Sequence, residues 1–262
     1  MSARRTGIAL LLCGAVVVVG LGLVAAALIL GGSSPAASSA TASPSPEADA
    51  MAPEPEDAGS ADAGSAEEGY VPSGIVLLSD PAWVLRVSEA SGIPARALSA
   101  YAGADLYARE HYGCEVGWNT LAAIGFVESE HGTLQGGSIE EDGVARPSIT
   151  GIALDGTSSA AIPDTDGGAI DGDDEWDRAM GPMQFIPDTW GRWGTDGDED
   201  GVADIHDIDD AALTAARYLC QAHGTMAGQD AWIAAIRSYN DSADYQRRVA
   251  DAADHYAQFT TE

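Results

Sequence analysis

The most restrictive feature of the chain is a long uncharged apolar run at its start. Residues 7–30 are 24 consecutive residues without a charge. As a helix this run would be about 36 Å long, enough to cross a hydrocarbon core of roughly 30 Å. A cleaved signal peptide is the alternative, but its apolar region is only about 7–15 residues long. Residues 1–30 are therefore predicted to form a single-pass transmembrane anchor.

The charges that flank this run predict its orientation. Arg4 and Arg5 precede it, and no basic residue follows it closely. Basic residues stay preferentially on the cytoplasmic side, so we expect the N-terminus inside and the rest of the chain on the extracytoplasmic side of the cell membrane.

Residues 31–69 have a different composition from the run before them. They are Ser, Ala, Pro, Gly and acids, with eight carboxylates, no basic group and Met51 as the one large apolar residue. Such a segment cannot bury enough apolar surface to offset its ordering entropy, so a disordered tether is predicted. Residues 70–262 then form the folded head.

The charge balance excludes one class of partner. The chain has 41 acidic residues against 12 basic ones and a formal charge of −29. A nucleic-acid-binding protein needs a basic face that displaces counterions from phosphates, so no nucleic-acid partner is expected. Hydrophobic residues make up 45 % of the chain, which is enough for a packed core.

The head contains two cysteines, Cys114 and Cys220. In an oxidising compartment an isolated pair of this kind predicts a disulfide. Two thiols are too few for a zinc site, and no pair of histidines at ligand spacing accompanies them.

The periodicity of apolar residues predicts a mainly α-helical head. Apolar residues recur three and four positions apart, without clear alternation typical of strands. The expected helices end at Gly92, open at Pro94, run from Trp118 to about Glu128, and cover 209–220, 229–238 and 243–258. Residues 133–178 interrupt this pattern with a long loop rich in Gly and Asp, which is either a solvated insertion or a functional loop.

Three short segments stand out in the head: GFVESEHG at 125–132, GPMQFIPDTW at 181–190, and RSYN at 237–240. Together they resemble lytic transglycosylases of the lysozyme-like superfamily, particularly the membrane-bound B type and its actinobacterial relatives. Each is short, but their order and spacing match the family over about residues 80–258. The resemblance implies a lysozyme-like fold and the cleavage of the β-1,4 bond between N-acetylmuramic acid and N-acetylglucosamine in peptidoglycan.

The resemblance also implies the reaction. In such enzymes the C6 hydroxyl of muramic acid attacks C1 and yields a 1,6-anhydro product, so one Glu serves as acid and then as base. Glu128 matches that residue, and Glu130 is its competitor. On a continuing helix the two would point nearly opposite ways, so they would not form a carboxylate pair. Ser129 is counted among the substrate-binding residues, although a local hydrogen bond that steadies the turn is the simpler role for its hydroxyl, and His131 is expected to be exposed.

The other two segments are expected to supply the saccharide groove. Gln184 resembles the glutamine that lines the groove, with Met183 beside it, and Tyr239 and Asn240 would face the acid and orient the sugar. One alternative is a muramidase that hydrolyses the same bond, with Asp164, Asp166 or Asp177 as second carboxylate. Another is a non-catalytic module that binds peptidoglycan or adheres to the cell wall with Ca²⁺.

Residues 196–207 resemble an EF-hand loop. Counted from Asp196, carboxylates occupy positions 1, 3, 5, 9 and 12, with Gly201 at position 6. Hard oxygen ligands in this pattern bind Ca²⁺, and the glycine permits a sharp turn. A structural calcium site is therefore predicted, with Asp210 as an alternative last ligand if the loop is longer than twelve residues. The predicted ligands are Asp196, Asp198, Asp200, the Val202 carbonyl, Asp204 and Asp207.

Overall fold

The computed structural model describes residues 70–223 and 226–259. The predicted anchor and tether lie outside these residues. Within the described ranges, no helix combines the length and the apolar character that a membrane crossing requires.

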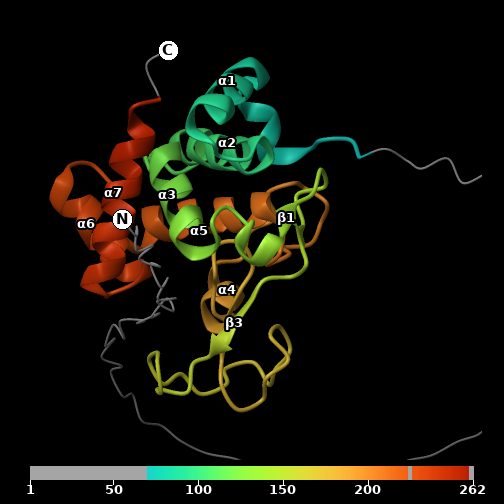
Figure 1. Cartoon of the computed structure of the whole chain (residues 1–262), viewed down its shortest axis with the longest axis vertical. Coiled ribbons are helices and arrows are strands. Elements are labelled where there is room, and N and C mark those ends of the chain that lie inside the picture. The colour runs from blue at the N-terminus through green and yellow to red at the C-terminus, as the bar shows by residue number, and fades with distance from the viewer. Residues whose placement is uncertain (1–69, 224–225, 260–262) are drawn as a thin grey trace, which may run out of the picture. The chain divides into compact units, whose positions relative to one another are not determined.

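The described chain is mainly helical, as predicted and as a lysozyme-like domain would be (Figure 1). Six of its α-helices fall where apolar periodicity placed them. The elements run in the order η1 Gly74–Leu78, α1 Pro81–Ser91, α2 Ala95–His111, α3 Trp118–Ser129, η2 Leu134–Gly136, β1 Ser138–Ile139, β2 Ala145–Arg146, β3 Thr150–Ala153, β4 Arg178–Met180, α4 Pro187–Trp193, α5 Ile208–His223, α6 Gln229–Tyr239 and α7 Ala243–Ala257.

Local signals set several helix ends. Asp80 caps α1 by accepting a hydrogen bond from the Ala82 amide at 2.8 Å, and Pro81 occupies the first turn. Gly92 ends this helix in the left-handed conformation, with φ of 78°. Because these residues act through their nearest neighbours, the sequence alone reveals where α1 begins and ends.

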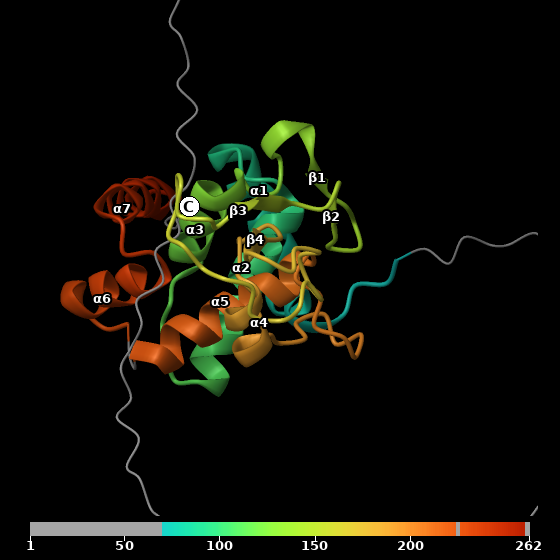
Figure 2. The same ribbon diagram turned by 90° about the horizontal axis from the view of Figure 1, so that it is seen from below.

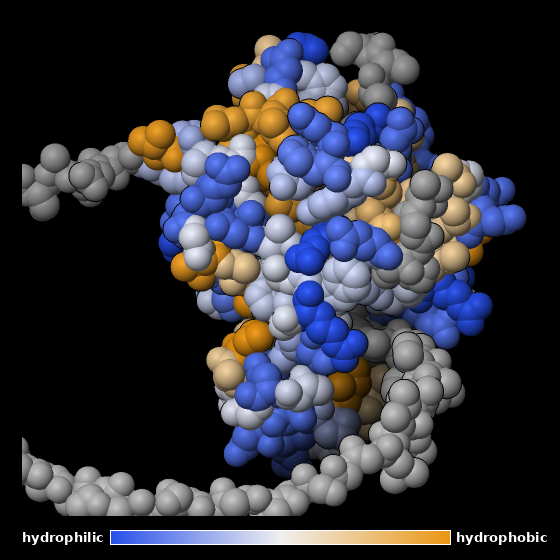
Figure 3. Space-filling view, turned by 180° about the vertical axis from the view of Figure 1, so that it is seen from behind, coloured by the Kyte–Doolittle hydropathy of each residue, from blue (hydrophilic) through white to orange (hydrophobic). Residues whose placement is uncertain are grey.

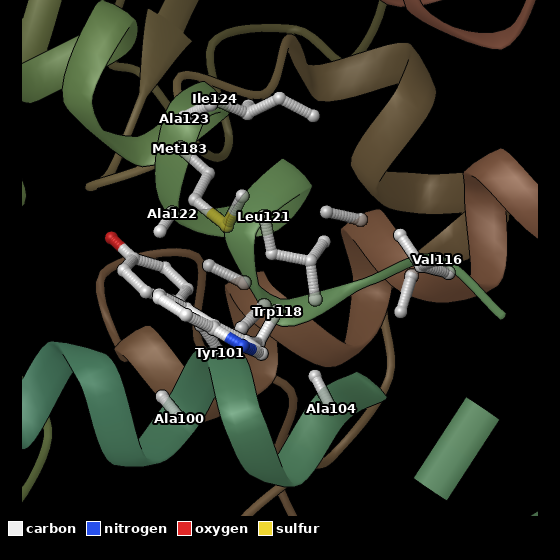
Figure 4. Packing of buried hydrophobic residues seen from close by; sticks show 14 of the residues in the cluster. Ala100, Tyr101, Ala104, Val116, Trp118, Leu121, Ala122, Ala123, Ile124 and Met183 are labelled. Atoms are coloured by element: carbon white, nitrogen blue, oxygen red, sulfur yellow. The ribbon is translucent and has the colours of Figure 1, made fainter. Parts of the chain in front are cut away.

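The core lies where α2, α3 and α5 meet. α2 packs against α5 and η1, and α3 packs against α7. Figure 2 shows α6 and α7 on one side of these central helices and β1 and β2 on the other. Gly103 lets η1 approach α2 closely, since a Cβ there would lie 2.1 Å from the Ile75 carbonyl oxygen. Figure 4 shows part of this core, where the α3 side chains Leu121 and Ile124 are fully buried.

A disulfide between Cys114 and Cys220 confirms the predicted pairing. It joins the connection between α2 and α3 to the last turns of α5, across 106 residues of sequence. The bond therefore links two segments of the core that are far apart in the chain.

The acidic stretch 133–178 contains strands that the periodicity did not predict. β1 pairs antiparallel with β2, and β3 pairs antiparallel with β4. Each of these strands has two to four residues, too few for alternation to be recognised in sequence. A small separate core of Leu154, Ala179 and Ile186 supports the second sheet.

Many acids of this stretch organise its backbone. Asp164 accepts hydrogen bonds from the amides of Asp166, Gly167 and Gly168 at 2.9–3.1 Å. These contacts lower the pKa of Asp164, because amide hydrogen bonds favour the carboxylate. The abundance of Asp in this loop is thus explained by turns that close on their own backbone.

The surface of the head is mostly hydrophilic, with an apolar area near the start of the described chain (Figure 3). Leu77 and Leu85, each with 65 % of its surface exposed, line a hollow in this part of the fold together with Pro72 and Val84.

Candidate active site

Glu128 lies in the last turn of α3, with its side chain buried. The helix ends directly after Ser129, because Glu130 adopts the left-handed conformation with φ of 52°. Glu130 is exposed. The two neighbouring acids therefore have opposite environments, and only Glu128 is positioned as an acid in an apolar setting.

Burial raises the pKa of Glu128 to about 7, from an ordinary value of 4.5. The hydroxyl of Tyr245 and the positive charge of Arg248 act against this shift, since both favour the carboxylate. The Oε2 atom of Glu128 is buried without a hydrogen-bond partner among the described residues. A carboxyl group with this pKa is partly protonated near neutral pH and can donate its proton to a substrate atom that enters the site.

Two tyrosines form a wall beside the acid. The rings of Tyr239 and Tyr245 are nearly parallel, with an interplanar angle of 4° and centroids 6.4 Å apart. Burial raises the pKa of both hydroxyls, and the charge of Glu128 raises it further. The predicted proximity of Tyr239 to Glu128 thus agrees with the electrostatics of the site.

The end of α6 connects this wall to the second predicted segment. Tyr239 donates a hydrogen bond to the Met183 carbonyl oxygen at 2.8 Å. Asn240 is buried directly after the helix, and its side-chain oxygen accepts from the Ser242 amide at 3.0 Å. This contact leads into α7, the helix that carries Tyr245. One short turn therefore positions both tyrosines.

Gln184 lies at the mouth of a cleft. It adopts positive φ of 51°, and its side-chain nitrogen donates to the Gly181 carbonyl oxygen at 3.0 Å. The side chain is half-buried. The cleft is small and mostly apolar and aromatic; it is lined by Gln184, Phe185, Ile186, Thr189, Tyr218, Ser238 and Tyr239, and Glu128 is not among these residues.

Ser129 and Met183, both predicted to contact substrate, face the protein interior instead. The Ser129 hydroxyl donates to the Pro182 carbonyl oxygen at 2.6 Å and accepts from the Gly132 amide at 2.8 Å. The Met183 side chain is fully buried beside Ala122 of α3 (Figure 4). These residues hold the Gln184 segment against the end of α3, and neither side chain is available to a saccharide.

His131 is also buried, contrary to its expected exposure. Its Nδ1 lies 3.3 Å from the Tyr101 hydroxyl and its Nε2 lies 2.9 Å from the Tyr256 hydroxyl. Burial lowers the pKa of His131 to about 4, so the ring is neutral at physiological pH. The sequence around His131 is an apolar helix followed by a turn. It does not indicate that two tyrosines far away in the chain enclose the ring.

The three candidate second carboxylates accept hydrogen bonds from their own loop. Asp164 and Asp166 both accept hydrogen bonds from amides of their own loop. Asp177 accepts from the amide and hydroxyl of Thr165 at 2.9 Å. Among the described residues, the groups that shift the pKa of Glu128 by charge or hydrogen bonding are Tyr245 and Arg248. A second carboxylate is not among them.

The acidic loop at 196–207 folds with EF-hand features. The Gly201 amide donates to the Asp196 side chain at 2.9 Å, which is the contact between positions 1 and 6, and Gly201 has φ of 95°. Carboxylate oxygens of Asp196, Asp198 and Asp210 all lie within 4.8 Å of one another. This geometry favours Asp210, the alternative last ligand of a longer loop.

The predicted twelfth ligand, Asp207, lines the same pocket as Asp198 and Asp210 but does not belong to the group of three whose oxygens lie within 4.8 Å of one another. Its Oδ1 accepts from the Asp209 amide at 2.7 Å and so caps the start of α5. The remaining predicted ligands lie along the same loop. Asp200 accepts from the Val202 amide at 2.7 Å, Asp204 accepts from the His206 amide, and Val202 is exposed.

The cluster of Asp196, Asp198 and Asp210, called the Asp cluster below, has the chemistry that a hard cation requires. The Oδ1 atom of Asp196 is buried without a hydrogen-bond partner among the described residues. Burial, together with the charges of Asp198 and Asp196, raises the pKa of Asp210 to about 7. Carboxylates that repel one another, with a free oxygen among them, are an appropriate ligand set for a divalent ion.

Glu128 at the end of α3, the parallel rings of Tyr239 and Tyr245, and the cleft lined by Gln184 all belong to this candidate site. Residues 170–238 match the family model of the transglycosylase SLT domain. The match confirms the resemblance to the lytic transglycosylases of the lysozyme-like superfamily, which act on peptidoglycan. It includes Gln184 and the Asp cluster, whereas Glu128 and Tyr239 lie outside it. Searches of curated proteins and of solved structures returned no significant match.

Proposed function

We propose that this protein is a lytic transglycosylase that cleaves the β-1,4 bond between N-acetylmuramic acid and N-acetylglucosamine and forms a 1,6-anhydro product. The observation that carries the proposal is Glu128, a buried acid with a pKa of about 7 to which no second carboxylate contributes a shift. A hydrolase of the usual kind needs two carboxylates. A transglycosylase needs one, because its nucleophile belongs to the substrate.

Glu128 acts twice in this reaction. It first donates its proton to the glycosidic oxygen as the bond between that oxygen and C1 breaks. The carboxylate then accepts the proton of the C6 hydroxyl while the C6 oxygen bonds to C1. The acid is regenerated and no water is consumed. Burial among apolar and aromatic side chains favours the protonated starting state.

The residues around the acid would hold the sugar. Gln184 offers an amide at the cleft, and Tyr239 presents a ring beside Glu128. Asn240 supports this arrangement from the turn between α6 and α7. Tyr245 would steady the carboxylate once its proton has left, since its hydroxyl favours the charged form.

We propose a structural Ca²⁺ held by Asp196, Asp198 and Asp210. The ion would neutralise the repulsion within the cluster and order the loop between α4 and α5. The ion would take no part in bond cleavage. The loop that holds it would affect the cleft only by stabilising the fold around Gln184.

We further propose that the head acts on the cell-wall side of the membrane, anchored by residues 1–30 through the tether 31–69. The disulfide between Cys114 and Cys220 supports this location, because such bonds persist in oxidising compartments. The substrate is found on the same side.

Digestion of purified peptidoglycan followed by mass spectrometry tests the proposal. The products should be anhydro-muropeptides, about 18 Da lighter than hydrolysis products because no water is added. Glu128→Gln should abolish cleavage, and the matched control Glu130→Gln should retain most of it. Products with reducing ends would assign a muramidase. An active Glu128→Gln variant would refute the assignment of the acid.

A further inference from the structure

His131 is a buried ionisable side chain that the proposed reaction does not use. It is 5 % exposed, and it is enclosed by Tyr101 of α2 and Tyr256 of α7. Figure 4 shows Tyr101 in the core, where α2 meets α3. A neutral imidazole has one donor and one acceptor, and each ring nitrogen lies within 3.3 Å of a tyrosine hydroxyl. Both nitrogens are therefore satisfied, and the ring is held from two helices.

The backbone that carries this ring turns sharply at the end of α3. Glu130, His131 and Gly132 are three consecutive residues in the left-handed conformation, with φ of 52°, 60° and 81°. A non-glycine residue adopts this conformation at a cost, and two in succession persist only where the surrounding structure holds them. The Glu130 side chain is exposed. Of the two non-glycine side chains in the turn, that of His131 is therefore the one anchored in the core.

Gly125, one turn before the end of α3, makes room for this arrangement. A Cβ at Gly125 would lie 2.1 Å from the Tyr101 hydroxyl oxygen, so a side chain there would push this tyrosine away from the ring of His131. The His131 amide also donates to the Gly125 carbonyl oxygen at 3.0 Å. The last turn of α3 is thus packed around His131 through both its backbone and its ring.

Glu128 lies inside the segment that these contacts fix, in the last turn of α3. On the other side of the turn, the Ser129 hydroxyl accepts from the Gly132 amide at 2.8 Å and donates to the Pro182 carbonyl oxygen at 2.6 Å. Helix ends fray unless they are held. If the left-handed turn opened, the last turn of α3 would lose its end, and water would reach the Glu128 carboxyl.

We propose that His131 is a positioning residue for Glu128, an inference that rests on the proposed function. Its ring, held between Tyr101 and Tyr256, fixes the left-handed turn after α3 and keeps the Glu128 carboxyl away from water. The ring neither gives nor takes a proton in the reaction, because both of its nitrogens already face tyrosine hydroxyls.

The pH dependence of kcat/KM on soluble peptidoglycan strands tests this inference. Glu128 must start protonated, so wild-type activity should fall as the pH rises through about 7. In His131→Ala, water at the carboxyl should lower the pKa of Glu128 and move this fall down by about one pH unit. The result is a loss of about fivefold at pH 7 beyond any loss at pH 5. Tyr256→Phe removes one hydroxyl partner of the ring, and it should move the fall in the same direction by less.

A matched control separates this effect from a loss of stability alone. Leu219→Ala removes a fully buried side chain of α5, and its activity should keep the wild-type pH dependence. Tyr245 and Arg248 also act on the candidate acid, but neither a tyrosine nor an arginine changes its charge near pH 7. Asp207 and Asp210 titrate in this range in every variant, so the comparison is between variants at each pH.

A second measurement does not depend on activity. At pH 8, Glu128→Gln should raise the melting temperature less in the His131→Ala background than in the wild-type background. The reason is that ionised Glu128 is less costly to the folded protein once water reaches it. An equal gain in both backgrounds would mean that His131 does not keep water from the acid, which overturns the inference.

The kinetic outcomes are equally distinct. A loss in His131→Ala that is the same at every pH would assign the residue a purely structural role and overturn the inference, as would unchanged kinetics. If His131→Ala does not fold, Tyr256→Phe decides, and a wild-type pH dependence in that variant overturns the inference. If the wild-type protein cleaves no strands, the proposed function fails, whereas the comparison of melting temperatures still decides whether His131 keeps Glu128 buried.

Discussion

Replacement of Glu128 by Gln should stabilise the folded protein while it abolishes activity. The folded-state pKa of about 7, against an ordinary 4.5, means that ionising Glu128 costs more in the folded chain than in the unfolded chain. At about 1.36 kcal/mol per pH unit, the difference is about 3 kcal/mol. Gln keeps the shape and cannot ionise, so the variant avoids this cost.

The size of the stabilisation depends on pH. Because the folded-state pKa of this acid is raised, its contribution to stability is fully present below pH 4.5 and is lost as the pH rises through 7. The free energy of unfolding of Glu128→Gln should therefore match that of wild type near pH 4. Near pH 8 it should exceed that of wild type by about 3 kcal/mol, or about 6–12 °C in melting temperature.

Urea denaturation at several pH values, followed by circular dichroism, measures this difference. Other buried acids titrate in the same range, notably Asp207 and Asp210, so the comparison must be between variants at each pH. Glu130→Gln is the matched control, because this neighbouring side chain is exposed. The argument from burial is refuted if the difference in free energy of unfolding between Glu128→Gln and wild type is the same at pH 4 and at pH 8.

Three further outcomes are expected. Alkylation should detect no free thiol at Cys114 or Cys220 before reduction, and reduction should cost about 2–4 kcal/mol of stability; accessible thiols would contradict the pairing. Ca²⁺ should raise the melting temperature relative to EDTA. Asp210→Asn should lose that gain and Asp207→Asn should keep it, whereas the reverse result would restore the twelve-residue loop. Leu121→Ala should destabilise the protein by about 2–5 kcal/mol in urea titrations, because its side chain is fully buried; a loss under 1 kcal/mol would show that the core collapses around the cavity.

The helices could be predicted from sequence because their signals are local, whereas Glu128 was selected by the resemblance of the 125–132 segment to the transglycosylase family. The N-terminal cap at Asp80 and the left-handed stop at Gly92 act within one turn of α1. Apolar spacing of three and four residues identified α3, at whose end Glu128 lies. The EF-hand pattern at 196–201 could be recognised in the sequence for the same reason, because its turn depends on contacts within a few residues.

Tertiary packing alone decided which side chains near Glu128 are accessible. Ser129 and Met183 stand beside predicted functional residues in sequence, yet both face the interior, because the Pro182 segment closes onto the end of α3. His131 is enclosed by tyrosines of α2 and α7 that are 30 and 125 residues away.

The last member of the Asp cluster was likewise decided by the fold. A twelve-residue pattern selects Asp207, but the start of α5 uses that carboxylate as its cap and brings Asp210 to Asp196 and Asp198. Sequence spacing thus determined which segments fold into helices and turns, because those depend on neighbouring residues. The side chains that meet at the site were determined by contacts between distant segments, which spacing does not encode.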